Sequence, residues 1–371
     1  MNQSDQQFIA RALQLAERGL YSADPNPRVG CVLVKEGGII GEGWHQWAGD
    51  GHAEINALAD AKTRNLNPQG AVVYLSLEPC CFEGKTGPCT QALIAAGVSR
   101  VVYGMEDPNP RVAGQGLAQL KAAGIIVSGP LMEENARDLN PGFIKRMETG
   151  LPFVRIKMAM SLDGRTAMAS GESKWITSAP ARVDVQKLRA RSSAVVTGIG
   201  TVQYDNPELS VRPEELGIVG ERVRQPLRVV VDSQWQLPDN ARILQAEGKV
   251  LQAGIAPSPS PTLIQNDKCE SVVIESKNGR VDLLYLLQHL ATLNCNEVLV
   301  EAGAGLAGQF LQQALVDEIV IYVAPKLLGN KARPLFELPL DSMAAQLGMR
   351  IREIRAVGQD WRVRATVDPE A

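Results

Sequence analysis

Three residues that can bind a metal and one carboxylate that can move a proton lie close together in this sequence. His52, Cys80 and Cys89 offer one imidazole and two thiolates, a ligand set typical of zinc. Three protein ligands leave the fourth tetrahedral position open to a water, as in catalytic rather than structural sites. Bound zinc lowers the pKa of that water to about 7. Glu54, two residues after the histidine, is placed to accept and return its proton, which predicts a zinc-dependent hydrolase.

The same residue types occur in zinc deaminases, in which an activated water attacks the amine-bearing carbon of a base and ammonia leaves. Their pattern is H-x-E followed by P-C-x-x-C, whereas eight residues separate Cys80 from Cys89 here. H-x-E alone is common by chance, and a cysteine in a strand is usually a small buried side chain. Yet two of the three histidines and three of the six cysteines fall within residues 45–89, and this clustering favours the metal site.

A glycine-rich turn in the second half of the chain predicts a nucleotide site. The pattern G-x-G-x-x-G at residues 303–308 follows an apolar run ending at Glu301 and precedes a helical pattern that reaches Ala314. Backbone N–H groups at such a helix start bind phosphate, although a glycine turn can also serve packing alone. A second glycine turn at residues 198–201 favours a dinucleotide. The late position of G-x-G-x-x-G argues against a Rossmann fold, which has it after the first strand.

The elements that must position these groups alternate between helix and strand. Up to residue 147, helices are expected at 6–18, 52–61, 90–96 and 114–123, and strands at 30–34, 71–77, 101–104 and 125–127. Beyond it, strands are expected at 153–158, 195–198, 227–232, 297–301 and 319–323, and a surface loop at 257–261. Strands separated by helices predict two α/β domains with mostly parallel sheets. Gly150 and Pro152 mark the passage between them.

Composition narrows the class of protein. A chain of 371 residues with 45% hydrophobic and 21% charged residues predicts two globular domains. A formal net charge of −3 without a dense Lys/Arg run disfavours a nucleic-acid partner. No apolar run reaches the length of a membrane span, and the clustered cysteines suit metal ligands and buried thiols better than a disulfide framework. We expect a cytoplasmic protein that acts on small molecules and contacts neither nucleic acid nor membrane.

Taken together, the motifs resemble one family over essentially the whole chain: the bifunctional riboflavin-biosynthesis deaminase/reductases, called RibD or RibG. The matching stretches are residues 25–30, 43–45, 48–49, 52–54 and 77–89 in the first half and 161–167, 171–177, 205–207 and the turn after Glu301 in the second. The resemblance implies a cytidine-deaminase-like three-layer α/β/α domain at 1–147 and a dihydrofolate-reductase-like α/β domain at 148–371.

The resemblance also implies two reactions. The first is Zn²⁺-dependent hydrolytic deamination of 2,5-diamino-6-ribosylamino-4(3H)-pyrimidinone 5′-phosphate. The second is NADPH-dependent reduction of the ribosyl side chain, which gives 5-amino-6-ribitylaminouracil 5′-phosphate. The corresponding expectation for assembly is a homodimer formed through the reductase domain.

Residue roles follow from the same resemblance. Zinc would be held by His52, Cys80 and Cys89, with Glu54 as the proton shuttle. The pyrimidine substrate or its phosphate would be contacted by Asn26, His45 and Lys85. NADPH would be bound by Ala159, Trp175, Thr201, Asp205, Ser233, Gly303, Ala304, Gly305, Leu306, Ala307, Gly308 and Gln309. The sugar phosphate would be bound by Ser173, Arg189, Leu209, Arg212 and Glu301. Protons would be handled by Lys157 and Glu301 while C1′ accepts hydride.

One departure from the family pattern leaves alternatives open. Cys81-Phe82 stands where Ser-His is usual, and Gly87 replaces a usual proline. The absent histidine removes a polar substrate contact, so one alternative is a reductase with an impaired deaminase. Others are a deaminase for another nucleoside-like substrate or for tRNA, and a regulatory protein that binds metal and nucleotide without catalysis. The long cysteine spacing disfavours a deaminase for another substrate, and the intact Glu54 disfavours a regulatory protein without catalysis.

Overall fold

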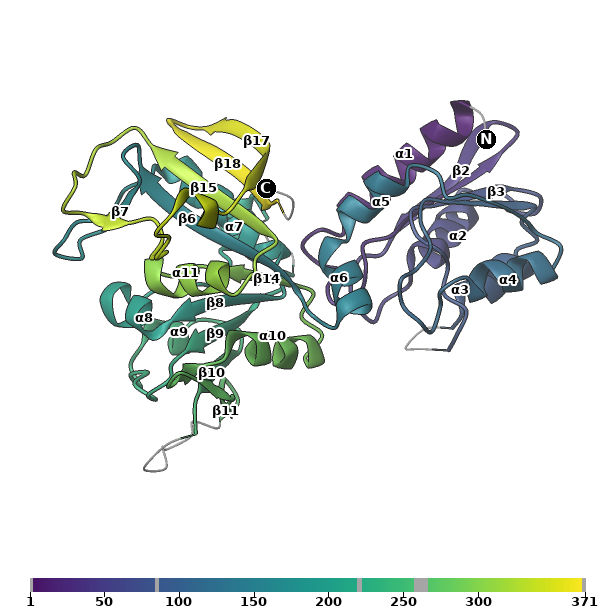
Figure 1. Ribbon diagram of the computed structural model, residues 1–371. Coiled ribbons are helices and arrows are strands. Elements are labelled where there is room, and N and C mark those ends of the chain that lie inside the picture. The colour runs from purple at the N-terminus through teal and green to yellow at the C-terminus, as the bar shows by residue number, and fades with distance from the viewer. Residues whose placement is uncertain (1–2, 84–86, 219–221, 257–265, 369–371) are drawn as a thin grey trace. The chain divides into compact units, whose positions relative to one another are not determined.

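The computed structural model describes residues 3–83, 87–218, 222–256 and 266–368. The chain divides into two compact units, residues 1–151 and 152–371 (Figure 1). The last helix of the first unit, α6 (Pro141–Thr149), spans the boundary expected after residue 147 and ends at Gly150 with a φ of 72°, a left-handed conformation that favours glycine. The loop expected at 257–261 lies outside the described residues.

The first unit is a five-stranded sheet with helices on both faces, in the order β2-β1-β3-β4-β5. Its strands are β1 (Gly30–Lys35), β2 (Gly38–Trp44), β3 (Val72–Leu75), β4 (Arg100–Tyr103) and β5 (Ile126–Ser128). Its remaining helices are α1 (Gln3–Glu17), α2 (Ala53–Thr63), α3 (Cys89–Ala95), α4 (Gln115–Ala122) and α5 (Glu133–Leu139). Helices α1 and α5 cover one face, and α2, α3 and α4 cover the other (Figure 1). This is a three-layer α/β/α arrangement.

The first sheet is less parallel than the sequence predicts, because β2 was not expected. Strands β3, β4 and β5 are parallel, but β1 runs antiparallel to both β2 and β3. The chain reverses from β1 into β2 at Glu36 and Gly37, whose φ values of 52° and 80° suit a two-residue hairpin turn. No strand was expected there, and β2 contains three glycines, a residue that is depleted in strands.

Those glycines set the position of α2. A Cβ on Gly43 would lie 2.4 Å from both the carbonyl oxygen of Ala53 and the amide nitrogen of Ala57. A Cβ on Gly41, two residues earlier on the same face of the strand, would lie 2.4 Å from the carbonyl oxygen of Ala57. Helix α2 therefore packs with its backbone against β2, and its N-terminal residues are fixed at the end of the sheet.

The second unit contains a nine-stranded sheet in the order β11-β10-β9-β8-β14-β6-β15-β18-β17. Its strands are β6 (Phe153–Ser161), β8 (Ala194–Gly198), β9 (Leu227–Val231), β10 (Val250–Gly254), β11 (Cys269–Val273), β14 (Glu297–Val300), β15 (Glu318–Ala324), β17 (Met349–Val357) and β18 (Asp360–Val367). Two short antiparallel pairs lie outside it: β7 (Arg165–Ala167) with β16 (Arg333–Pro334), which are distant in the chain, and the hairpin of β12 (Ser276–Lys277) with β13 (Arg280–Val281).

The seven strands of the large sheet from β11 to β15 in its spatial order are parallel, as expected. Strand β18 runs antiparallel to both β15 and β17. The helices are α7 (Ala179–Arg191), α8 (Ile199–Asp205), α9 (Arg242–Gln245), α10 (Leu283–Thr292) and α11 (Ala304–Gln312), with short 3₁₀ turns at Pro213–Leu216 and Met343–Ala345. Helix α7 packs on one face of the sheet, and α10 and α11 lie on the other (Figure 1).

Strand order indicates where this unit binds a ligand. The chain moves outward from β8 through β9 and β10 to β11, and then returns to place β14 between β8 and β6. Ligands of open parallel sheets bind beyond the carboxyl ends of strands at such a reversal. In the described part of the chain, no helix is both long and apolar enough to cross a bilayer.

Candidate active sites

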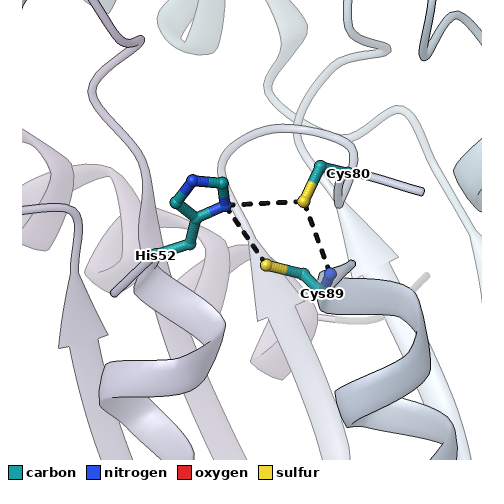
Figure 2. A group of neighbouring side chains, drawn as sticks. All are labelled: His52, Cys80 and Cys89. Carbon is teal, nitrogen blue, oxygen red and sulfur yellow. Dashed lines mark hydrogen bonds between the residues drawn. The ribbon is translucent and has the colours of Figure 1, made fainter. Parts of the chain in front are cut away.

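The three predicted zinc ligands meet at one point of the first unit. His52 is the residue before α2, Cys80 follows β3, and Cys89 is the first residue of α3. The imidazole Nδ1 of His52 lies 3.5 Å from the Sγ of Cys80 and 3.3 Å from the Sγ of Cys89 (Figure 2). A tetrahedral zinc with bonds of about 2.3 Å to sulfur and about 2.0 Å to nitrogen would separate such atoms by about 3.5 Å. The donor set and its spacing therefore fit zinc.

The protein holds at least one of the two sulfurs ready as a thiolate. The Cys80 sulfur accepts hydrogen bonds from the Cys89 thiol and from the backbone N–H of Cys89, the latter over 3.4 Å, and lies beside His52. The hydrogen bond from Cys89, together with His52, lowers the pKa of Cys80 to about 4. Thiolates are the form in which cysteine binds metal, so the site is prepared for a cation.

Glu54 lies at the same cluster, inside α2. Its side chain is 3% exposed and makes a hydrogen bond with the Cys89 thiol. Burial, and next the negative charge of Cys80, raise its pKa to about 7. A carboxyl group titrating near neutral pH can both take and give a proton, which suits the predicted shuttle.

Two of the three predicted pyrimidine contacts form a pair. The side-chain amide of Asn26 lies 3.1 Å from Nε2 of His45, and Nδ1 of His45 lies 3.2 Å from the carbonyl oxygen of Gly51. The His45 ring stands edge-on to the His52 ring, with centroids 5.2 Å apart. Burial lowers the pKa of His45, which favours the neutral ring. Lys85 lies outside the described residues.

Cys81 and Phe82 are both engaged with the loop that carries Arg111. The Cys81 thiol donates a hydrogen bond of 3.8 Å to the carbonyl oxygen of Arg111, and the Arg111 guanidinium lies 4.3 Å above the Phe82 ring. Cys81 is not a member of the three-residue ligand cluster. Phe82, which stands where the family usually has a histidine, thus lies against the Arg111 guanidinium.

Glu78 is a residue whose role the sequence did not reveal. Its carboxylate accepts hydrogen bonds from four backbone N–H groups, those of Asp107, Gly114, Gly116 and Leu117, over 2.9–3.3 Å. It thereby ties the start of α4 and the loop before it to the segment that delivers Cys80. Its place in Leu77-Glu78-Pro79-Cys80 was the only available signal.

In the second unit, the buried Glu301 carboxylate forms one group with the partly buried side chains of Lys157 and Arg189. One edge of the Arg189 guanidinium donates two hydrogen bonds to the Glu301 carboxylate, Nε to Oε1 over 2.6 Å and Nη2 to Oε2 over 3.1 Å. The Lys157 ammonium lies 3.7 Å from Oε2. Burial lowers the pKa of Lys157 despite the carboxylate. Burial works against ionised Glu301, but Arg189 and Lys157 outweigh it and lower its pKa.

The remaining residues predicted to bind the sugar phosphate, Ser173, Leu209 and Arg212, have other partners than Glu301. Ser173 donates a hydrogen bond of 3.2 Å to Asp205, which brings a predicted substrate residue to a predicted cofactor residue. Leu209 is buried with a φ of 54°, an uncommon conformation for a side chain of this kind. Arg212 is more exposed and pairs with Glu215.

Three of the twelve predicted NADPH residues line one cavity of about 310 Å³ beyond the ends of β8 and β9. These three are Ser233, Leu306 and Gln309. The other lining residues come from the glycine turn at 198–200, from the end of β9 and the loop after it, and from β13 with the glycine before it. A Cβ on Gly303 would meet no atom within 4 Å, which leaves space at the start of α11, whereas one on Gly308 would lie 2.3 Å from the Glu337 carbonyl oxygen. One glycine thus serves access and the other packing.

The other nine predicted NADPH residues are not among those that line this cavity: Ala159, Trp175, Thr201, Asp205, Gly303, Ala304, Gly305, Ala307 and Gly308. Ala159 lies on β6 and Thr201 on α8. The Trp175 ring is 63% exposed, and the Arg182 guanidinium lies 4.5 Å from its centroid. The open space at Gly303, at the start of α11, and a cavity lined by polar side chains fit a polar ligand such as NADPH.

Comparison with known proteins gives matches over the whole chain. Residues 152–363 match the family described as RibD C-terminal domain, and residues 2–105 match the cytidine and deoxycytidylate deaminase zinc-binding region. Riboflavin biosynthesis protein RibD of Escherichia coli K12 is 48% identical over 96% of this chain and 97% of its own length. The protein of that name from Bacillus amyloliquefaciens is 36% identical over 97% and 96%.

Solved structures agree. Acinetobacter baumannii RibD superimposes with a TM-score of 0.88 at 44% identity, covering 98% of this chain and 99% of that one. The diaminohydroxyphosphoribosylaminopyrimidine deaminase/5-amino-6-(5-phosphoribosylamino)uracil reductase of Thermotoga maritima gives a TM-score of 0.87 at 31% identity, with the same coverage.

Proposed function

The chain belongs to the RibD family of riboflavin-biosynthesis proteins, and from that premise we propose how its residues carry out the two reactions. It is a bifunctional enzyme, a zinc-dependent pyrimidine deaminase followed by an NADPH-dependent reductase, and it acts on small molecules. The observation that carries the residue assignment is the meeting of His52, Cys80, Cys89 and Glu54 at one point.

In the deaminase, His52, Cys80 and Cys89 would hold zinc. When bound there, zinc would supply a Lewis acid that lowers the pKa of a water. Loss of a proton makes that water a nucleophile for the carbon bearing the 2-amino group. Glu54 takes the proton of that water and delivers it to the departing amine, so that ammonia leaves. A pKa of about 7 matches both halves of this task.

Asn26 and His45 position the pyrimidine in this proposal. Their mutual hydrogen bond and the bond from His45 to Gly51 fix the plane of the imidazole beside His52. Lys85 would bind the phosphate of the substrate. Arg111, held over Phe82, offers a positive charge in the same loop region. The alternative of a chain without deaminase function is not favoured, since both domains match their families.

In the reductase, Lys157 rather than Glu301 is the proton donor. Lys157 has a lowered pKa, so its ammonium is a stronger acid than an ordinary lysine, whereas Glu301 has a lowered pKa and stays ionised at neutral pH. Lys157 therefore protonates the ribose ring oxygen as the ring opens and C1′ accepts hydride. The Glu301 carboxylate pairs with the Lys157 ammonium, and Arg189 pairs with the same carboxylate.

Substrate and cofactor meet at the ends of β6 and β14 in this proposal. Ala159, Trp175, Thr201, Asp205, Ser233 and residues 303–309 bind NADPH, which supplies the hydride. Ser173, Leu209 and Arg212 bind the sugar phosphate, and Arg212 is the arginine whose exposure leaves it accessible to a phosphate. The hydrogen bond from Ser173 to Asp205 joins the two groups of residues.

Assembly as a homodimer through the reductase domain is also part of the proposal. Strand β17 is the outer strand of the large sheet, and Ile351 and Ile354 on it are 59% and 58% exposed. Trp361 on the adjoining β18 is 53% exposed. A long edge strand with apolar side chains is suited to pairing with another chain. Light scattering of the wild-type chain and of an Ile351→Glu, Ile354→Glu variant tests this; a dimer in both would contradict it.

A cytoplasmic location completes the proposal and is supported by the cysteines. All six are free thiols in the structure, including the three clustered near the metal site. Free thiols are usual where the environment is reducing. Fractionation of cells that produce the protein would test it, and recovery with the membranes or outside the cell would contradict it.

The assay that tests the function follows the pyrimidine substrate by mass spectrometry with zinc-loaded protein. Without NADPH we expect the loss of one amino group, with release of ammonia, and no reduction. On adding NADPH we expect a gain of two hydrogens by the deaminated product. Reduction without deamination would overturn the assignment of the first domain, and deamination alone would overturn that of the second.

A further inference from the structure

Arg280 is brought to the reductase cavity by a short pair of strands, β12 and β13, whose turn and second strand line the cavity. It begins β13, which pairs with β12 so that Arg280 stands opposite Lys277. The turn between them, Asn278-Gly279, has φ values of 53° and 73°, as a two-residue hairpin requires. Arg280 and Ser233 both line the cavity.

Ser233 fixes this hairpin to the end of β9 and remains able to donate. The backbone N–H of Val281 donates a hydrogen bond of 3.1 Å to the Ser233 hydroxyl oxygen. A serine hydroxyl that accepts one bond still has its own proton to donate. The residue next to Val281 is Arg280, so this bond also holds the backbone of Arg280 beside the cavity.

Asp232 places a negative charge at the same end of β9. One carboxylate oxygen accepts from the backbone N–H of Leu237 over 2.8 Å and from the side chain of Gln252 over 2.9 Å. The other oxygen is buried and has no donor within the described residues. In dinucleotide sites a carboxylate of this kind binds the ribose 2′-hydroxyl of NAD, whereas a nearby arginine accommodates the 2′-phosphate of NADP.

We propose that Arg280 determines the choice of NADPH over NADH, by binding the 2′-phosphate of the adenosine together with the Ser233 hydroxyl. This rests on the reductase function proposed above. Asp232 is fully buried, but its negative charge beside the cavity disfavours a phosphate, and Arg280 offsets that charge. The planar guanidinium suits the phosphate, since it can offer two parallel hydrogen bonds. Ile199 and Leu306, which also line the cavity, supply apolar surface for the adenine.

Equilibrium titration of the full chain with NADPH and NADH, followed by fluorescence or calorimetry, tests the proposal without turnover. Arg280→Ala should weaken NADPH binding roughly 10- to 100-fold, as expected for the loss of a charge-assisted contact, and leave NADH binding within about 2-fold. Arg280→Lys should retain part of the preference. Lys277→Ala removes the same charge from the partner strand and should change neither affinity by more than about 2-fold.

Two fragments isolate the phosphate from the nicotinamide. Adenosine 2′,5′-bisphosphate should lose affinity in Arg280→Ala to the same extent as NADPH, and adenosine 5′-monophosphate should be unaffected. An equal loss of NADPH and NADH, or an unchanged preference for NADPH, would overturn the proposal. Wild-type protein that reduces substrate with both cofactors equally would overturn it while leaving the reductase function intact; wild-type protein that binds neither would refute the function itself.

Discussion

Arg189 and Glu301 form a two-pronged ion pair within the reductase site, with Nε–Oε1 and Nη2–Oε2 distances of 2.6 and 3.1 Å. The guanidinium also donates to the carbonyl oxygen of Ser210 over 3.2 Å. The hydrogen-bonding edge of this arginine is therefore directed at a protein carboxylate. Its role in the proposal is to hold Glu301 beside Lys157, which is 3.7 Å away.

Arg189→Met should destabilise the reductase unit by about 3–5 kcal/mol, since it leaves a buried carboxylate short of its main partner. The double variant Arg189→Met, Glu301→Gln should lose less, because no buried charge is then abandoned. Urea unfolding of both variants measures this. A double variant less stable than Arg189→Met would show that the pair is not the unit of stabilisation.

The pH dependence of reduction should identify the proton donor. The protonated form of Lys157 is the active one, so the rate falls as pH rises through its pKa, and burial lowers that pKa below the ordinary lysine value. Glu301 raises the pKa of Lys157, so Glu301→Gln should move the alkaline limb to lower pH. NADPH oxidation by the wild type and by Glu301→Gln, measured against pH with the deaminated substrate, tests this shift. An alkaline limb that moves to higher pH in the variant would contradict the assignment of Lys157. Lys157→Ala should reduce the rate by about 10²- to 10⁴-fold.

Packing of β2 against α2 can be tested at its glycines. Gly43→Ala would place a Cβ 2.4 Å from the backbone of α2 and should cost about 1–3 kcal/mol, with weakened zinc binding because His52 and Glu54 move with the helix. Gly38→Ala, on the same strand, meets its nearest atom at 3.6 Å and is the matched control. Thermal unfolding of the two should differ clearly, and equal losses would contradict the close approach.

Glu78 should position the first zinc cysteine without touching substrate. Glu78→Gln weakens four hydrogen bonds from backbone N–H groups and should lower the stability of the first unit by about 1.5–3 kcal/mol. Zinc affinity should fall as well, whereas the affinity for NADPH should not change. Glu83→Gln, at an exposed position nearby, serves as the control. Unchanged zinc affinity in Glu78→Gln would refute the positioning role.

The sequence predicted the residues that carry the chemistry better than it predicted the structure around them. The spacing of His52, Cys80 and Cys89 was sufficient to expect one metal site, and the strand and helix pattern was sufficient to expect two α/β units. Strand β2 was missed because its glycines, which serve packing against α2, are also typical of loops. Arg280 was missed because its place at the cavity depends on a hairpin that meets β9 only in three dimensions. The donors that surround Glu78 lie 29–39 residues away, which no local pattern reveals.

The measurement that tests the central claim most directly uses two variants that each lack one reaction. Zinc-loaded Glu54→Gln should retain its metal and fail to deaminate, and Lys157→Ala should deaminate and fail to reduce. Each alone should therefore give no final product from the pyrimidine substrate and NADPH, and mixing them should restore it, as measured by mass spectrometry. Full product from Glu54→Gln alone, or none from the mixture of folded variants, would contradict the account.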